Sequence, residues 1–268
     1  MRPSATEKPA TAIYLRGAIY GLAAVCIWAA FIVVSRLGVR TGLTPWDIAA
    51  IRFAVAGVLL LRHFAKRGLA IDRLGWGGVA AIIAGCGAPA MLLVNAGLLF
   101  APAAHAGALY PGVSPLMVAI LAAVVLKEPF TVRTRVGFVL IVIGALAIVW
   151  NKGGAIDASQ NVGHALFLLA GLAWAAYTVA MRRARLDGLH AAAIGAVASL
   201  VLYLPVYVYF AGAGVFRAPW FDIVLQAVVQ GLLTAIVALL LYGRMVSLLG
   251  ATRGAAFVAL TPVATALP

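Results

Sequence analysis

The sequence predicts an all-α integral membrane protein with two inverted five-helix repeats, a ten-helix plan that this chain follows into its ninth helix. Three observations support this prediction. Of the 268 residues, 65% are hydrophobic and only 10% are charged, whereas an ordinary soluble domain has about 25% charged residues. Apolar runs of about twenty residues tile the chain, and its second half repeats the pattern of the first. The composition therefore excludes a soluble protein.

Five apolar runs fill the first half of the chain. Each run is continuous, whereas the strands of a membrane barrel alternate polar and apolar residues, so the runs predict helices. Pro45 and Pro129 precede two of them, where the first turn of a helix tolerates proline. The predicted spans are Gly17–Leu37, Trp46–Leu61, Leu74–Leu99, Pro102–Leu126 and Val132–Trp150.

The second half holds three more complete spans and the start of another. The complete spans are His164–Met181, Ala191–Phe210 and Phe221–Leu249, and the next begins at Ala251. Two five-helix copies need ten helices, so the second copy stops within its fourth helix. We expect a truncated sequence, with completion by a partner chain as the alternative.

An internal repeat relates the two halves. At an offset of 146 residues, Trp28–Phe31 aligns with Trp174–Tyr177, and Arg36 aligns with Arg182. A repeat unit of five spans is odd, so the second copy must enter the membrane from the opposite face, as in many secondary transporters. The predicted divisions are an N-terminal tail (1–16), a first repeat (17–150), a linker (151–162) and an incomplete second repeat (163–268).

The basic residues predict the orientation. Of the 20 Lys and Arg residues, fifteen lie on the amino-terminal side of the predicted spans and four on the other side, with Arg52 inside a span. Because cytoplasmic loops carry the excess of basic residues, the N-terminus is predicted to be cytoplasmic, in the cytoplasmic membrane. A net charge of +13 would suggest nucleic acid in a soluble chain. Here the charges lie between apolar spans, so the expected partner is the lipid bilayer and not nucleic acid.

Several motifs occur in a specific order. A Trp followed by small and aromatic residues, Thr44-Pro45 and Arg52-Phe53 lie within Leu22–Phe53, and further motifs follow at Asn95–Leu98, Ser114-Pro115, Lys127-Glu128-Pro129 and Gly137–Gly144. In this order they resemble the drug/metabolite transporter superfamily, in particular its EamA-type members. The resemblance covers nearly the whole chain. It implies two five-helix repeats and export or exchange of small metabolites by alternating access, with many members handling amino acids.

Arg52 is the most informative charge. It lies about six residues inside its span, or roughly 9 Å deep, where an Arg is costly unless it faces protein or water. One interpretation is a site for a substrate carboxylate or phosphate, which a guanidinium binds at two points. The other is a contact that locks helices through backbone carbonyls, or snorkelling to the interface.

Other candidate residues for a substrate cavity are aromatic or polar. Trp28 and Trp174 lie near the middle of their spans, and Tyr177 is on the same helix face as Trp174. Cavity lining and plain packing are both open for them. The polar side chains expected to face inward are Asn95, His105, Tyr110 and Ser114. For His105, a proton site and a structural hydrogen bond are the alternatives.

Three prolines within helices are candidate hinges. Pro111, Pro115 and Pro262 would free carbonyl groups in the fourth and ninth helices. A static kink is the alternative interpretation.

The functional class follows from what the spans lack. All seven acidic residues fall in loops or at span ends, so a mid-membrane carboxylate for ion coupling is not expected. The sequence shows no metal-ligand set, cofactor motif or nucleophile cluster, so an enzyme is not expected. We therefore predict a secondary transporter of small organic metabolites, most simply amino acids or related solutes, that works as an exporter or exchanger. A non-transporting membrane scaffold or assembly protein is the alternative, and the oligomeric state is open.

Overall fold

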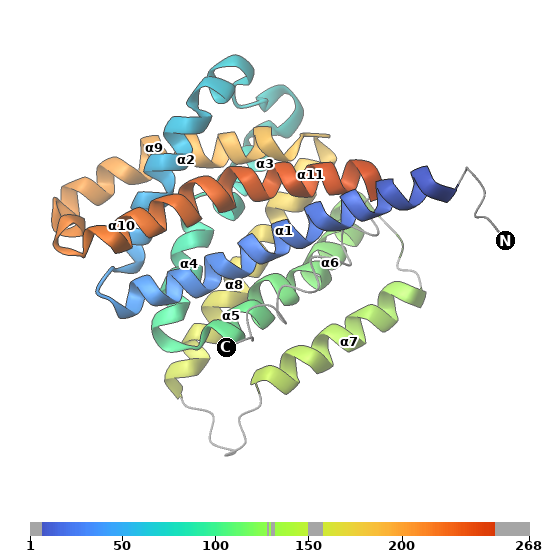
Figure 1. Cartoon of the computed structure of the whole chain (residues 1–268), viewed down its shortest axis with the longest axis horizontal. Coiled ribbons are helices and arrows are strands. Elements are labelled where there is room, and N and C mark those ends of the chain that lie inside the picture. The colour runs from blue at the N-terminus through green and yellow to red at the C-terminus, as the bar shows by residue number, and fades with distance from the viewer. Residues whose placement is uncertain (1–6, 128, 130–131, 150–157, 250–268) are drawn as a thin grey trace.

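The protein is a bundle of long helices in the computed structural model, which describes residues 7–127, 129, 132–149 and 158–249 (Figure 1). This part of the chain contains no strand. Seven of its helical stretches are long and apolar enough to cross a membrane, and α7 is a shorter apolar helix. The prediction of an all-α membrane protein is thus confirmed. The ninth predicted span lies outside the described residues.

The first half contains four membrane spans, two of them broken, and the shorter apolar helix α7. Its elements are α1 (Glu7–Arg40), α2 (Pro45–Arg67), α3 (Ile71–Cys86), α4 (Ala88–Phe100), α5 (Ala103–Gly107), the π-helix η1 (Ala108–Gly112), α6 (Ser114–Leu126) and α7 (Val132–Val149). The third span consists of α3 and α4, and the fourth consists of α5, η1 and α6.

The second half contains three spans in its described residues. Its elements are α8 (Ala158–Arg183), α9 (Gly188–Ala211), the 3-10 helix η2 (Gly214–Arg217), α10 (Trp220–Gln226), the π-helix η3 (Ala227–Val237) and α11 (Ala238–Leu249). The last three form one continuous stretch. All eight complete spans expected from the sequence therefore contain helix.

Local hydrogen bonds define two helix starts. At α2, the Thr44 hydroxyl accepts the N–H of Asp47 at 3.2 Å, and the Asp47 carboxylate accepts the N–H of Thr44 at 2.7 Å. This reciprocal capping box satisfies two N–H groups that the helix itself leaves free. At α9, the Asp187 carboxylate accepts the N–H of His190 at 2.8 Å. Both helices thus begin where short polar side chains occur in the sequence.

The break between α3 and α4 is covered by α9. Ser199 of α9 accepts the N–H of Ala88 at 2.8 Å and donates to the carbonyl of Gly195 at 2.7 Å. A side chain at Gly87 would collide with Ser199 Oγ and with the carbonyl of Ile83. The break therefore needs a residue without Cβ, and a hydroxyl from another helix satisfies its free donor.

The two halves meet along α2 and α9, which pack closely together. At one end, Arg67 of α2 forms an ion pair with Asp187 at the start of α9. At the other end, Tyr207 near the end of α9 donates a hydrogen bond to Asp47 at the start of α2. The two helices therefore run antiparallel. Each is the second span of its half, so this is the relationship that an inverted repeat requires.

The other main contacts between the halves also join antiparallel helices. The first span of the first half, α1, packs against η3 and α11, which belong to the third span of the second half. Gly17 near the start of α1 lies against Leu249, and Gly38 near its end lies against Gln226. This pair is therefore also antiparallel.

The first span of the second half mirrors this arrangement. α8 packs against α3 and α4, the third span of the first half. Gly85 of α3 lies against Tyr177, and Gly97 of α4 lies against Phe167, so α8 runs antiparallel to both. In each half, the first span thus packs on the third span of the other half.

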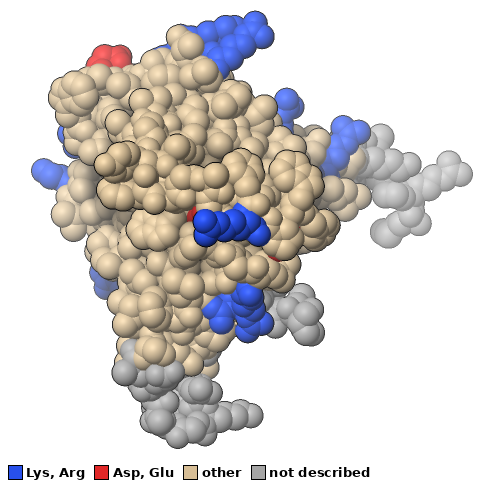
Figure 2. All heavy atoms as spheres, turned by 90° about the vertical axis from the view of Figure 1, so that its left-hand side faces the viewer, with Lys and Arg blue, Asp and Glu red and all other residues tan. Residues whose placement is uncertain are grey.

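The core lies where these helices cross, and the outer surface is largely apolar. Ile32, Phe53, Val94 and Phe167 are almost fully buried. Large apolar side chains on the outside are exposed, and Figure 2 shows a broad uncharged surface with few acidic or basic side chains. Such a surface fits contact with lipid tails rather than with water.

Candidate substrate site

The Arg52 guanidinium lies inside the bundle and has few polar partners. Its Nη1 donates to Oε1 of Gln230 at 3.3 Å, and its Nε is buried without a hydrogen-bond partner. The guanidinium carbon lies 5.5 Å from the centre of the Phe31 ring and 5.7 Å from that of Phe53, which gives cation–π contact. The described residues place no carboxylate in an ion pair with it. The group can therefore accept an anionic partner.

Gln226 and Gln230 connect Arg52 to α1. Gln230 Nε2 donates to Ser35 Oγ at 2.6 Å and to Gln226 Oε1 at 3.2 Å. Gln226 Nε2 donates to the carbonyl of Val34 at 2.7 Å. Both glutamines are almost fully buried, so a connected polar network joins α1, α2 and the last described span.

Aromatic side chains form two groups in the same part of the bundle. Trp174 packs against Tyr177 and Tyr110, with ring centroids 5.0 and 6.3 Å apart, respectively. Trp28 packs against Tyr242 at 5.5 Å. Tyr110 belongs to the same core cluster as Phe31 and Phe53, the two rings that lie against Arg52. The structure thus brings Trp174, Tyr177 and Tyr110 together next to the rings that hold Arg52, whereas Trp28 pairs with Tyr242.

Asn95 lies within α4, and Ser114 is the first residue of α6, next to η1. Asn95 is buried, and its Nδ2 donates to the carbonyl of Pro45 at 3.5 Å, while its Oδ1 has no partner. Ser114 donates to the carbonyl of Tyr110 across η1. Both side chains face protein, and Asn95 keeps one free buried acceptor.

The candidate hinges differ in their surroundings. Pro111 lies inside η1, and Pro115 lies in the first turn of α6. Pro262 lies outside the described residues. The fourth span is therefore irregular where the two described prolines occur.

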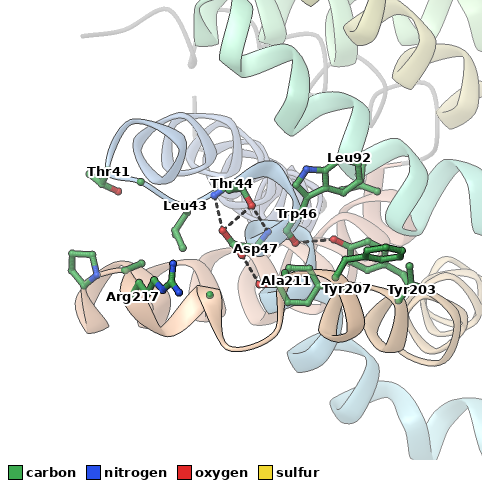
Figure 3. A pocket seen from close by; sticks show the side chains of 16 residues that line it. Thr41, Leu43, Thr44, Trp46, Asp47, Leu92, Tyr203, Tyr207, Ala211 and Arg217 are labelled. Carbon is green, nitrogen blue, oxygen red and sulfur yellow. Dashed lines mark hydrogen bonds between the residues drawn. The ribbon is translucent and has the colours of Figure 1, made fainter.

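A pocket lies at the end of the bundle where the α1–α2 loop faces the end of α9 and η2 (Figure 3). Its volume is about 750 Å³. The Asp47 carboxylate accepts hydrogen bonds from Thr44, through Oγ1 at 2.7 Å, and from the Tyr207 hydroxyl. The Tyr203 hydroxyl donates to the carbonyl of Trp46 at 2.8 Å. Arg217 lines the same pocket. The pocket thus combines a buried carboxylate, aromatic rings and one exposed guanidinium.

Comparison with known proteins identifies the family. The sequence pattern of the EamA-like transporter family matches residues 15–150 and 161–267. The chain belongs to this family. It is also 28% identical over 241 residues to the "Uncharacterized transporter YyaM" of Bacillus subtilis (strain 168). This match covers 83% of this chain and 75% of the relative. One solved crystal structure matches with a TM-score of 0.49 and 18% sequence identity, covering 92% of this chain and 93% of the other.

Membership of the EamA-like transporter family places the site in a membrane transporter with an internal repeat. The predicted residues fall into separate groups. Tyr110, Trp174 and Tyr177 lie together near Arg52, and Trp28 pairs with Tyr242. His105 instead contacts His164, with Nδ1 and Nε2 3.0 Å apart. None of these residues lines the pocket of Figure 3. No group of three or more His, Cys, Asp or Glu side chains is placed to hold a metal ion within the described ranges.

Sequence reasoning missed the residues that partner Arg52 and those that line the pocket. Gln226 and Gln230 stand four residues apart in a largely apolar span, which is a readable signal for one polar helix face. The Thr44–Asp47 spacing is a capping-box signal. Tyr203 has no comparable local signal, because its role depends on the approach of α9 to α2.

Proposed function

We propose that this protein moves small organic solutes across the cytoplasmic membrane by alternating access, as an exporter or exchanger. Amino acids and related carboxylates are the first solutes to test. The partly buried Arg52 guanidinium carries the proposal, because its buried Nε has no hydrogen-bond partner and no carboxylate pairs with it among the described residues. A substrate carboxylate would supply the missing charge and two hydrogen-bond acceptors.

The surroundings of Arg52 support a solute site. Gln230 orients the guanidinium, and Phe31 and Phe53 hold it away from water. Trp174 and Tyr110 offer aromatic faces for the rest of a solute. We infer that Asn95, Ser114, Trp28 and Tyr177 complete this region. His105 lies at its edge and has a structural role there.

Movement is proposed to occur at the broken spans. The α2–α9 pair is held at both ends, by Arg67–Asp187 and by Tyr207–Asp47. The fourth span is interrupted by η1, with Pro111 and Pro115. We infer that α2 and α9 move as one unit while the interrupted helices bend. The pocket of Figure 3 then serves as the entry or exit at one end.

The proposed orientation follows the basic residues. Fifteen of the 20 Lys and Arg residues lie on the side of the N-terminus, which we place in the cytoplasm together with residues 1–16. The two repeats are proposed to span 17–150 and 163–268, joined by 151–162. A single cysteine introduced at Lys66 should then react with a membrane-impermeant reagent only from the cytoplasm, and one at Arg217 only from outside. The reverse pattern would overturn the orientation.

Flux measurements test the transport function. The full-length protein in liposomes should exchange radiolabelled amino acids or other carboxylates faster than protein-free vesicles. Uncharged and purely cationic solutes of similar size serve as comparisons, because they lack the group that Arg52 would bind. Absence of flux for every solute, with protein correctly folded, would favour a membrane scaffold.

An Arg52 variant tests the site separately. Arg52→Lys keeps the positive charge but loses the planar pair of donors, so solute affinity should fall about tenfold or more while the melting temperature changes little. Arg40→Lys is the matched control, because Arg40 is exposed near the end of α1. If Arg52→Lys lowered stability and left affinity unchanged, Arg52 would be a helix-locking residue instead.

A further inference from the structure

A narrow groove lies on α8 between α3 and α6, away from the Arg52 site. Its volume is about 230 Å³. Small residues form much of its wall, including Gly77 and Gly78 of α3 and Ala176 and Ala180 of α8. Side chains of this size leave a channel along the helix surface that no neighbouring side chain fills.

Two arginines stand at one end of the groove. Arg73 is the third residue of α3, and Arg183 is the last residue of α8. Both side chains are exposed, and neither forms an ion pair within the residues that the structure describes. The nearby acidic residue in sequence, Asp72, is exposed and does not line the groove. Positive charge at this end is therefore uncompensated.

The arginines stand at the level of the membrane–water interface. Each lies at the end of a membrane span, Ile71–Phe100 and Ser159–Arg183, respectively. The exposed Trp76 is one turn from Arg73, and Trp is enriched at this level of a bilayer. The groove then runs from the headgroup region into the apolar part of the bundle.

We propose that this groove binds an anionic phospholipid. The phosphate lies between Arg73 and Arg183, and one acyl chain lies along α8 over Gly77. Guanidinium groups bind phosphate oxygens at two points, and basic pockets between membrane helices bind anionic headgroups. Apart from the two arginines, the wall offers apolar side chains and backbone, which suit a hydrocarbon chain and not a polar solute. This inference does not depend on transport.

Lipid retention tests the headgroup contact. The full-length protein is purified in detergent, mixed with phosphatidylglycerol or phosphatidylcholine, and analysed for bound lipid by native mass spectrometry. Phosphatidylglycerol should be retained at least tenfold better than phosphatidylcholine, because a choline group adds positive charge beside two arginines. The double variant Arg73→Gln/Arg183→Gln should lose this preference. The control Arg40→Gln/Arg217→Gln, at the opposite end of the bundle, should keep it.

A second variant tests the acyl-chain contact. A Cβ at Gly77 meets nothing within 4 Å, and Gly77 lines the groove, so Gly77→Leu adds apolar bulk to it. It should reduce phosphatidylglycerol retention several-fold while both arginines remain. Gly144→Leu is the control, because Gly144 of α7 also has open space around it.

Three results would overturn the proposal. The first is equal retention of the two lipids by the unaltered protein. The second is an unchanged preference in the double arginine variant. The third is full displacement of phosphatidylglycerol by millimolar inorganic phosphate, which would indicate a site for a free anion. A protein that binds the lipid but shows no flux would contradict the proposed transport and leave this site intact.

Discussion

His105 of α5 and His164 of α8 are joined through their ring nitrogens, with Nδ1 and Nε2 3.0 Å apart. Their ring centroids are 5.1 Å apart. Next to them, Gly163 lies against Ala101, and a side chain at Gly163 would collide with it. The contact therefore ties the first turn of α5 to the start of α8, and it connects the two halves through a pair of titratable groups.

The histidine pair should make stability depend on pH. One ring must donate and the other must accept, so the hydrogen bond needs at least one neutral ring. When both rings are protonated, both nitrogens are donors and the charges repel, so this stabilisation is present at neutral pH and lost as the pH falls. From about pH 7.5 to about pH 5, the melting temperature of the unaltered protein should fall more than that of His164→Gln. Parallel pH profiles would contradict this expectation.

Asp187 links the ends of α2 and α9. Burial raises the pKa of its carboxyl, but the N–H of His190 and the guanidinium of Arg67 lower it more, so the pKa lies below its usual value. The stabilisation is therefore complete above the usual pKa of about 3.9 and lost as the pH falls through the lower native pKa. At pH values near 7, Asp187→Asn keeps a cap and should cost about 0–1 kcal/mol.

Asp187→Ala separates the helix cap from the ion pair. It removes both contacts and should cost about 1 kcal/mol more than Asp187→Asn, measured by denaturant unfolding. Equal losses in the two variants would show that the cap at α9 contributes nothing.

Tyr207 and Asp47 connect the opposite ends of α2 and α9. The Tyr207 hydroxyl donates to a carboxylate that is buried beside the pocket of Figure 3. Tyr207→Phe removes the donor to Oδ1 of this carboxylate, while Thr44 still donates to Oδ2, and should cost about 1.5–3 kcal/mol in unfolding free energy. Tyr209→Phe is the control, because Tyr209 is 83% exposed and should change little. Equal effects of the two substitutions would mean that the hydrogen bond to Asp47 is unimportant.

Gly85 allows α3 to approach α8. A Cβ there would collide with the carbonyl of Ala173 and with Cβ of Tyr177. Because backbone cannot move aside cheaply, Gly85→Ala should destabilise the bundle by about 1–3 kcal/mol. Gly144→Ala meets open space and should be neutral or stabilising by up to about 1 kcal/mol, since alanine favours helix over glycine. A stabilising Gly85→Ala would refute the close approach of α3 to α8.

The helices were predictable because their signals are local. A bilayer leaves no water for backbone groups, so a continuous apolar run of about twenty residues can only be a helix. The repeat of Trp28–Phe31 in Trp174–Tyr177, with an odd number of spans per unit, indicated the inverted symmetry. The antiparallel packing of α2 on α9 agrees with it.

The partners of the site residues required the tertiary structure. Arg52 was recognisable as a costly charge, but its contact with Gln230 joins residues 178 positions apart. His164 and Tyr207 likewise act through helices of the other half. Sequence periodicity specifies which face of a helix is apolar, and here most faces are apolar, so it does not specify which helix covers which. Crossing positions, and hence the polar contacts, are decided by close packing at small residues such as Gly85.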